Sequence, residues 1–299
     1  VSLGPCDYIS TRFTSFSARP LENTRSHAPE GITLPRGTGE MPKRERDDVQ
    51  FSVETIFPGK STAETARDSL RYNDRWPHDG PCSPDEVALL LIDFQKDFCH
   101  PDGYLAKVGG DIEHAQTAVK KVMPVLEAAR NAGVMVFHTR EGHRPSLIDL
   151  SKYKKWRSCL AGAEIGMTSQ TGSKFLVRGS PGWEIIPELA PIEGEEVFDG
   201  PGYDKFMHTD LEHCLRCAGI KYLIVAGLTT EVCVSSTIRG ATERGLECIL
   251  VADGTAGSEM EFCRAHIKTM QVEGGIFGTI TEADLVCAAL KSLQSASVD

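Results

Sequence analysis

Hydrophobic residues along this chain fall into two patterns, short continuous runs and longer segments with a helical repeat. The short runs cover residues 87–92, 134–138, 196–199, 222–226, 246–253 and 275–279, and their length and β-branched content predict buried strands. Helices are predicted at 111–132, 183–189, 209–218, 232–244 and 259–271, with a closing helix from Glu282. Strands that alternate with helices predict a single α/β domain with a doubly wound, mostly parallel sheet covered by helices on both faces.

The first part of the chain lacks both patterns. Residues 1–69 are rich in Ser, Thr, Arg, Pro and Gly, which predicts a low-complexity tail that either wraps around the domain or stays disordered. The domain itself is predicted over 70–293, followed by a short tail at 294–299. Residues 1–25 weakly resemble an organelle transit peptide, but a truncated gene model or an unrelated disordered leader explains the same composition and is preferred.

The charge balance bears on the kind of partner. Asp and Glu number 42 against 32 Lys and Arg, a formal net charge of -10, which argues against a nucleic acid or an anionic membrane surface. The longest strongly apolar run stops at Asp93 and is far too short to span a membrane. We therefore expect a soluble protein with a small-molecule partner.

Cysteine usage indicates a reducing compartment. Ten cysteines in 299 residues, without a signal-peptide pattern, predict reduced thiols and a cytoplasmic protein rather than a disulfide framework. Cys214 and Cys217 form a C-x-x-C motif inside a predicted helix, with no second such motif and no suitably spaced His pair. Zinc or redox chemistry is therefore not expected there.

Ligands of parallel sheets bind at the carboxyl ends of the strands, so the residues after each predicted strand are candidates. These are Asp93 and Gln95 after the first strand, His138 to Arg140 after the second, Asp199 and Gly200 after the third, and Thr229 to Cys233 after the fourth. The glycine motifs that bind dinucleotides or nucleotide phosphates are absent from the sequence. No cofactor is expected.

Cys233 is the first candidate nucleophile because it lies where a strand runs into a helix. The N–H groups and the dipole of a helix N-terminus favour a thiolate and can stabilise an oxyanion beside the sulfur. A structural cysteine fits the same position, since Cys is small and often buried. Asp93 ends a wholly apolar strand, where burial raises a carboxyl pKa and suits it to exchange a proton with a thiol. An N-cap or loop-anchoring role is the alternative for Asp93.

For other polar and aromatic residues near the strand ends, the sequence allows both a functional and a structural role. Phe94, Phe98 and Tyr104 are pocket or core aromatics. The loop with Arg140, Glu141, His143 and Arg144 either binds a substrate or forms a self-satisfied ion network. No metal site is predicted in this loop.

Five segments, taken in order, resemble the isochorismatase-like cysteine hydrolase superfamily. They are LLIDFQKDF, HTREGHRP, RGSPGWEIIPEL, PGYDKFMHTDLEHCL and GLTTEVCVSST, and the nearest resemblance is to its biuret amidohydrolase branch, close to the ureidoacrylate hydrolases. The resemblance covers residues 70–292. It implies that Asp93 is the general base or acid, that Cys233 is the nucleophile, and that the Thr229–Thr230 peptide is a cis bond whose N–H groups point at the oxyanion. Phe94 and Phe98 are expected to contact the substrate.

Two positions depart from the family pattern. The third catalytic residue of the family is a Lys directly before the PGY-like segment, where this chain has Gly200. Lys205 and Lys96 lie nearby in the sequence, but neither matches the motif. Glu273 stands where the biuret branch has a Gln that reads the substrate amide, and a carboxylate there favours N–H donors over a substrate carboxylate.

The resemblance also separates this chain from two relatives. Isochorismatases proper cleave a vinyl ether without a cysteine nucleophile, so Cys233 favours hydrolysis of a C–N bond. Nicotinamidases carry a metal-binding Asp-x-His-His, where this chain reads Thr139, Arg140 and Glu141. We expect a homo-oligomeric, metal-free amidohydrolase that acts on a small, biuret-like ureide or carboxamide through a Cys233 thioester. The alternative is a silent member that binds such a ligand without turnover, because Gly200 replaces the family lysine.

Overall fold

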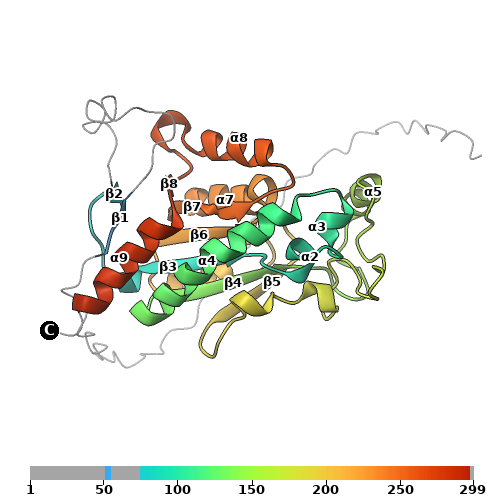
Figure 1. The fold of residues 1–299 in the computed structure, drawn as a ribbon, viewed down its shortest axis with the longest axis horizontal. Coiled ribbons are helices and arrows are strands. Elements are labelled where there is room, and N and C mark those ends of the chain that lie inside the picture. Colours follow the sequence, from blue (N-terminus) through green and yellow to red (C-terminus); the bar gives the residue numbers. More distant parts are fainter. Residues whose placement is uncertain (1–50, 55–74, 297–299) are drawn as a thin grey trace, which may run out of the picture. The chain divides into compact units, whose positions relative to one another are not determined.

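Six parallel strands form the central sheet of the computed structural model, which describes residues 51–54 and 75–296 (Figure 1). They are β3 (Val87–Ile92), β4 (Met135–Glu141), β5 (Glu196–Gly200), β6 (Tyr222–Leu228), β7 (Glu247–Ala256) and β8 (Thr279–Thr281). Their order across the sheet is β5-β4-β3-β6-β7-β8, and every neighbouring pair is parallel. The predicted doubly wound parallel fold is confirmed.

Helices cover both faces of the sheet. On one face lie α4 (Ile112–Ala132) and α9 (Ala283–Ala296), and on the other lie α6 (Leu211–Cys217), α7 (Ser235–Glu243) and α8 (Met260–Met270). Strand β3 serves both layers, because Leu89 and Leu91 pack with α4 and α9 while Leu90 and Ile92 pack with α6 and α7. A strand that is apolar on both faces is therefore a continuous apolar run, as the sequence pattern indicated.

Shorter elements complete the described chain. They are β1 (Val53–Glu54), β2 (Arg75–Trp76), α2 (Lys96–Cys99), α3 (Tyr104–Lys107) and α5 (Lys152–Leu160), with 3₁₀ turns at Pro84–Glu86, Pro181–Trp183, Pro187–Leu189 and Val272–Gly274. None of the helices in the described ranges combines the length and the apolar character that a membrane crossing requires.

The winding of the sheet reverses between β3 and β6. The chain moves outward from β3 through β4 to β5, then returns to β6 on the other side of β3 and continues through β7 to β8. At such a switch point the loops that follow the two central strands diverge to opposite faces, which opens a crevice at their carboxyl ends. Asp93 follows β3 and Cys233 follows β6, so the fold brings these two residues to that crevice.

Several predicted boundaries differ from the structure. The last strand is β8 at Thr279–Thr281 rather than 275–279, because Gly275 and Gly278 have φ angles of 92° and 141° that do not fit a strand. The predicted helix at 183–189 is helical only at its two ends, in the 3₁₀ turns Pro181–Trp183 and Pro187–Leu189, since Pro187 holds the preceding Ile186 in an extended conformation.

The predicted tails also differ in part. Most of the predicted N-terminal tail lies outside the described residues, but Phe51 and Val53 are buried in the core cluster that includes α4 and α9. At the other end, α9 continues to Ala296, beyond the predicted domain limit at 293. Only 297–299 of the predicted C-terminal tail fall outside the described residues.

Candidate active site

Cys233 lies in a π-helical turn, Thr230–Val234, that joins β6 to α7. The turn replaces the simple helix start that the sequence predicted, and it buries the Cys233 side chain to 2% exposure. Short π-helical segments are uncommon and occur often at functional sites. The thiol nevertheless reaches the crevice at the switch point, because Cys233 lines a cavity there.

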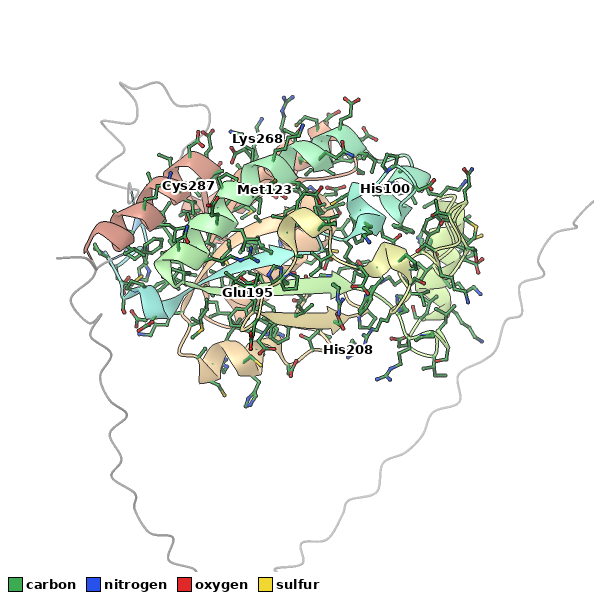
Figure 2. All side chains as sticks on the ribbon, turned by 60° about the horizontal axis from the view of Figure 1, so that its bottom comes forward. His100, Met123, Glu195, His208, Lys268 and Cys287 are labelled. Carbon is green, nitrogen blue, oxygen red and sulfur yellow. The ribbon has the colours of Figure 1, made fainter. Side chains whose placement is uncertain are left out.

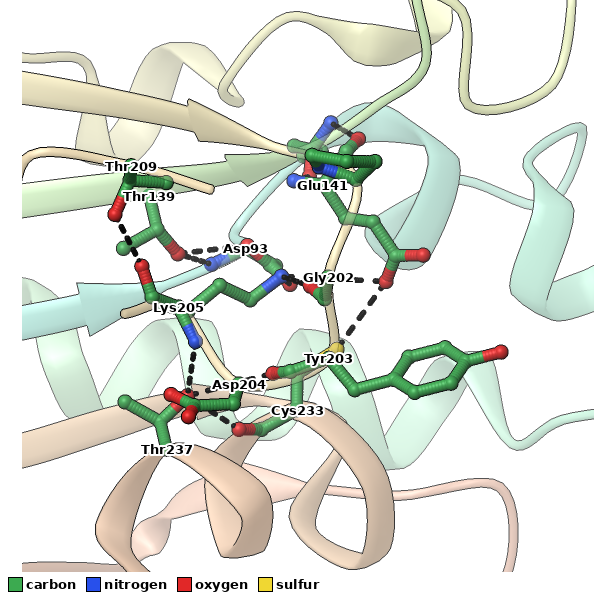
Figure 3. Close-up of polar contacts among 12 residues, drawn as sticks. Asp93, Thr139, Glu141, Gly202, Tyr203, Asp204, Lys205, Thr209, Cys233 and Thr237 are labelled. Carbon is green, nitrogen blue, oxygen red and sulfur yellow. Dashed lines mark hydrogen bonds and ion pairs between the residues drawn. The ribbon is translucent and has the colours of Figure 1, made fainter. Parts of the chain in front are cut away.

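Asp93 is the first residue after β3 and is fully buried. Its φ of 55° is unusual for a residue with a side chain, and such conformations persist where surrounding contacts hold them. The Thr139 hydroxyl donates a hydrogen bond to Asp93 Oδ1 at 2.7 Å, and Lys205 Nζ lies 2.5 Å from Oδ2 (Figure 3). The Asp93 carboxylate is thus held by one hydroxyl and one ammonium group.

Lys205 corrects the expectation that the site lacks a lysine. Its side chain is 1% exposed, and its Nζ also donates to the Gly202 carbonyl at 3.0 Å. The loop after β5 turns back toward α7, where Lys205 N donates to Thr237 Oγ1 at 3.1 Å. An ammonium group therefore reaches Asp93 from five positions beyond Gly200. The conformation of this loop places Lys205, which motif spacing did not reveal.

Gly200 itself ends β5 and leaves no room for a side chain. A Cβ atom there would lie 2.8 Å from Thr209 Cγ2. The Gly200 carbonyl accepts a hydrogen bond from Gly142 N at 3.0 Å, which fixes the strand end against β4. The missing side chain at Gly200 thus fits the close approach of Thr209.

Glu141 is a second buried carboxylate beside the thiol. Cys233 Sγ donates to Glu141 Oε2 at 3.2 Å, and Lys154 Nζ donates to Oε1 at 2.6 Å (Figure 3 shows the thiol contact). Lys205 Nζ lies 4.0 Å from Glu141 Oε2. Gln95 fixes the backbone of Glu141, because its Oε1 accepts from Glu141 N at 2.7 Å and its Nε2 donates to Glu141 O at 3.0 Å. The sequence allowed two roles for Glu141, substrate binding or a surface ion network. Its position at the carboxyl end of β4 was a signal that it could belong to the site.

Burial and the neighbouring charges shift the pKa values of the thiol and of the two carboxylates beside it. Burial raises the pKa of Asp93, and the Lys205 ammonium offsets this only in part. Burial also disfavours ionised Glu141, yet Lys154 and Lys205 together hold its pKa below the usual range. For Cys233, burial raises the pKa far above the ordinary value, Lys205 opposes the rise, and Glu141 and Asp93 add to it. The resting thiol is therefore protonated at neutral pH, unlike the thiolate expected from a helix N-terminus.

A cavity of about 420 Å³ opens beside Cys233. Its wall is mostly apolar and aromatic, with Phe98, Tyr104, Leu105, Val108, Ile165, Leu176, Val232 and Phe262. The polar groups are fewer and include Glu141, Lys154, Arg157, Tyr203 and Glu231. A largely apolar concave surface with a few fixed polar groups is the usual form of a small-molecule site.

Not every predicted site residue reaches this cavity. Phe98 lines it, whereas Phe94 is 2% exposed and belongs to the core. Glu273 was predicted to contact the substrate, but this residue is exposed in a turn after α8 and is not part of the cavity wall. The structure therefore does not bring Glu273 to the cavity beside Cys233.

Two of the strand-end candidates, His138 and Arg140, form ion pairs outside the cavity wall. His138 lies within β4, and its Nε2 contacts Glu195 Oε2 at 2.9 Å, with Arg130 on the same carboxylate (Figure 2 labels Glu195). Arg140 bonds Asp199 through Nε at 2.7 Å and lies 3.5 Å from the centroid of the Trp183 ring. The self-satisfied network that the sequence allowed for this loop is therefore found around Arg140.

The predicted cis peptide lies one residue earlier than expected, between Leu228 and Thr229. Thr229 lines the cavity, as an oxyanion-binding residue would have to. Thr230 is buried, and its hydroxyl bonds that of Thr255 at 2.9 Å, which ties the turn to β7. Of the two threonines, only Thr229 is placed to contact a ligand.

Asp93, Glu141 and Cys233 have side-chain atoms of the right kind to hold a metal ion, all within 4.8 Å of one another. A positive charge already lies beside these carboxylates, since Lys205 Nζ contacts Asp93 Oδ2 and lies near Glu141 Oε2. A divalent cation in the same place would face the repulsion of that charge. The donor set therefore suits Lys205 better than a metal.

Fold and site together define an α/β protein with a buried thiol and two carboxylate–ammonium pairs at the switch point of its sheet. The isochorismatase domain model matches residues 87–284, and the chain belongs to the isochorismatase family. A relative is the ureidoacrylate amidohydrolase RutB of Serratia proteamaculans strain 568, 28% identical over 211 residues that cover 70% of this chain and 84% of the relative.

Solved structures agree with this assignment. A cysteine hydrolase from Pseudomonas syringae pv. phaseolicola 1448A superposes with a TM-score of 0.61 at 27% identity, covering 73% of this chain and 97% of that chain. An isochorismatase family protein from Desulfovibrio vulgaris subsp. vulgaris strain Hildenborough gives 0.55 at 26% identity, with 72% and 99% covered. The chain thus has the isochorismatase-like α/β fold of a hydrolase family.

Proposed function

We propose that this protein is a cysteine-dependent amidohydrolase that cleaves a C–N bond of a small ureide or carboxamide through a thioester on Cys233. The observation that carries the proposal is the Cys233 thiol, which faces a cavity and lies between the Asp93–Lys205 and Glu141–Lys154 pairs. Attack of the sulfur on an amide carbonyl needs a proton acceptor and a nearby positive charge. Both are present within the site. The name of the Serratia relative, a ureidoacrylate amidohydrolase, supports an amide substrate.

The roles follow from position. Cys233 is the nucleophile, and a neighbouring carboxylate takes its proton as the sulfur attacks. Asp93 is the residue for which the sequence predicted this task. The Lys205 ammonium stabilises negative charge that develops near the sulfur and the carbonyl oxygen. Release of the amine leaves the thioester, and water then completes the turnover.

The cavity favours a substrate with an apolar substituent. Its wall is dominated by aliphatic and aromatic side chains, and each methylene group buried there contributes about 0.8 kcal/mol of binding. Biuret has no such group to bury. The sequence-based preference for a biuret-like compound came from the resemblance of the five segments to the biuret amidohydrolase branch, a branch from which Glu273 departs. We therefore place carboxamides and ureides with an apolar substituent ahead of biuret itself.

Catalytic silence was the alternative, and its reason was the glycine at position 200. Because Lys205 brings an ammonium group to Asp93, that reason no longer holds. A protein that only binds its ligand would also have little use for a nucleophile with a dedicated proton acceptor. The proposal of an active hydrolase is preferred for this reason.

The test is a panel of biuret, ureidoacrylate-like compounds, N-carbamoyl amino acids, and aliphatic and aromatic carboxamides. Release of ammonia or amine is followed together with the intact mass of acid-quenched protein, which reports a covalent acyl group. We expect turnover and a Cys233 adduct in the wild type and in Cys217→Ala, whose cysteine is exposed on α6, and neither in Cys233→Ala. No release from any compound and no adduct would overturn the proposal.

A further inference from the structure

Helix α5 is a positively charged element of a negatively charged chain. It carries Lys152, Lys154, Lys155 and Arg157 and no Asp or Glu, whereas the whole chain has a formal net charge of -10. The helix lies beside the cavity, because Lys154, Arg157 and Ser158 form part of the cavity wall. A local positive charge of this kind attracts anionic ligands to a site.

The two α5 cations in the cavity wall differ in their partners. Lys154 Nζ donates to Glu141 Oε1 at 2.6 Å and to the Pro201 carbonyl at 2.7 Å, so its charge is already paired. Arg157 forms no ion pair with a carboxylate in the part of the chain that the structure describes. It is exposed and also belongs to the wall, which places it where the cavity opens to solvent. Its positive charge can therefore meet a ligand.

The Arg157 guanidinium is held by two aromatic side chains of its own helix. Its Nε donates to the Tyr153 hydroxyl at 3.0 Å, and its Cζ lies 4.8 Å from the centroid of the Trp156 ring and 5.2 Å from that of Tyr153. A guanidinium has five N–H groups, and this contact uses one of them. The terminal nitrogens keep the parallel N–H groups that bind both oxygens of a carboxylate. Arg157 is thus preorganised for a carboxylate.

The acidic residues near the cavity do not oppose an anionic ligand. Glu141 is paired with Lys154, as described above. Glu231 Oε1 accepts from the backbone N–H and the hydroxyl of Ser258, both at 2.7 Å, while its Oε2 is buried and packs so closely on Gly257 that a Cβ would not fit there. Glu273, which was expected to disfavour a substrate carboxylate, is not among the described residues of the wall.

We propose that the substrate is itself an acid, a ureide or carboxamide with an apolar substituent and a carboxylate, and that Arg157 binds this carboxylate at the mouth of the cavity. This inference rests on the proposed amidohydrolase function and narrows its substrate class. The amide end reaches Cys233 and the apolar substituent contacts the wall. The carboxylate stays near solvent, where a charged group loses least hydration. N-carbamoyl amino acids with aliphatic or aromatic side chains have these three parts.

A purely structural role for Arg157 would give a different result. If the side chain only packs on Tyr153 and Trp156, its loss affects acidic and neutral substrates alike. If it binds the carboxylate, its loss slows the acid and leaves the neutral analogue unchanged. The ratio of kcat/KM for an acid and its neutral analogue isolates the contact, because effects on the fold or on Cys233 cancel in that ratio.

The probes are N-carbamoyl leucine, as both enantiomers, and isopentylurea, which is the same molecule without the carboxylate. N-carbamoyl phenylalanine and phenethylurea form a second pair. We expect the wild type to prefer the acid of each pair by about 10- to 100-fold in kcat/KM, the usual effect of a charge-assisted hydrogen bond. Arg157→Gln should lose most of this preference through slower turnover of the acid. Arg157→Lys keeps the charge but not the parallel N–H groups, so its preference should be intermediate.

Lys155→Gln is the matched control. It removes the same charge from the same helix, but Lys155 pairs with Glu164 and is not among the described residues of the cavity wall. This variant should keep the preference for the acid. Salt gives a second readout, because screening weakens the attraction between an exposed guanidinium and a carboxylate. The kcat/KM for the acid should fall with ionic strength in the wild type and much less in Arg157→Gln.

The remaining outcomes overturn the assignment, and they separate it from the proposed function. Turnover of the neutral ureas, or of neutral carboxamides, at or above the rate of the acids overturns the assignment and leaves the amidohydrolase standing. A preference for the acid that is equal in wild type and Arg157→Gln, or that Lys155→Gln loses to the same extent, does so as well. A wild type that converts neither the acids nor any neutral amide or urea overturns the proposed function and the assignment with it.

Discussion

Lys205 Nζ lies 2.5 Å from Asp93 Oδ2, with both side chains buried. The pair joins the loop after β5 to the carboxyl end of β3, on the side of the sheet where Cys233 also lies. Burial lowers the pKa of Lys205, but Asp93, Cys233 and Glu141 together outweigh this effect, so the ammonium form persists. A charge at this place influences both the stability of the fold and the chemistry of the thiol.

Lys205→Met is expected to impair both. Loss of one preorganised electrostatic donor costs about 3 kcal/mol in the transition state, or roughly 100-fold in kcat/KM. Removal of one partner from a buried ion pair costs about 3 to 5 kcal/mol of unfolding free energy. Kinetics and denaturant unfolding measure the two effects, with Lys155→Met as the control on an exposed pair.

A second variant separates stability from catalysis. The double variant Lys205→Met/Asp93→Asn removes both charges, so we expect it to recover much of the lost stability but not the activity. Full activity in Lys205→Met would show that this lysine has no part in the reaction.

Gly200→Ala is expected to destabilise the protein rather than to improve it. The new methyl group would lie 2.8 Å from Thr209 Cγ2, and overpacking of this kind typically costs about 1 to 3 kcal/mol. Thr209→Ser removes the clashing methyl but keeps the hydroxyl that donates to the Lys205 carbonyl. In a double-mutant cycle followed by urea unfolding, the two changes should therefore couple favourably. Strict additivity would mean that Thr209 is not the obstacle.

The sheet and two site residues were predictable because local sequence places them. An apolar run that forms β3 also puts Asp93 at its end, and the run that forms β6 does the same for the turn with Cys233. Parallel pairing then places the carboxyl ends of these two strands side by side, independently of the conformation of the loops.

The loop residues of the site were not predictable in this way. Lys205 and Lys154 reach the two carboxylates beside the thiol because the loop after β5 and the helix α5 lie against the strand ends. The structure does not place Glu273 in the cavity wall for the same reason. Its position in the sequence relative to the last strand does not determine the direction in which the loop runs. Motif alignment located a missing lysine at Gly200, whereas the charge itself comes from a neighbouring position in the same loop.

Alkylation of Cys233 should be slow at neutral pH and should accelerate only at high pH. Burial raises the thiol pKa well above its ordinary value, and Glu141 and Asp93 raise it further, so little thiolate is present. Glu141→Gln removes one of these negative charges, and we expect it to lower that pKa and to speed alkylation. Iodoacetamide labelling read by peptide mass against pH measures this, with exposed Cys159 as the internal reference. A Cys233 that reacts faster than Cys159 at neutral pH would contradict the protonated resting state.

Titration of the buried Asp97 carboxyl is expected to make the unfolding free energy of the protein depend on pH. Asp97 is 1% exposed in α2, and burial raises its pKa to about 6, although N–H groups of Leu176 and Tyr104 oppose the rise. Because the folded state holds this proton more tightly than the unfolded chain, the unfolding free energy falls as pH increases from about 4 to about 6. The integrated loss is about 3 kcal/mol, at 1.36 kcal/mol for each unit of pKa difference.

Asp97→Asn tests this directly, because the amide has no proton to lose and its oxygen can still accept from Leu176 N, which lies 2.8 Å from Asp97 Oδ2. The unfolding free energies of wild type and variant are compared by urea denaturation at pH values of about 4 and about 7. Relative to the wild type, the variant should gain about 3 kcal/mol over this interval, since only the wild type must bury a newly formed charge. Asp284→Asn, at an exposed position in α9, reports the effect of losing a carboxylate outside the core. A difference between wild type and Asp97→Asn that stays constant with pH would show that Asp97 is as easily ionised in the folded protein as in the unfolded chain.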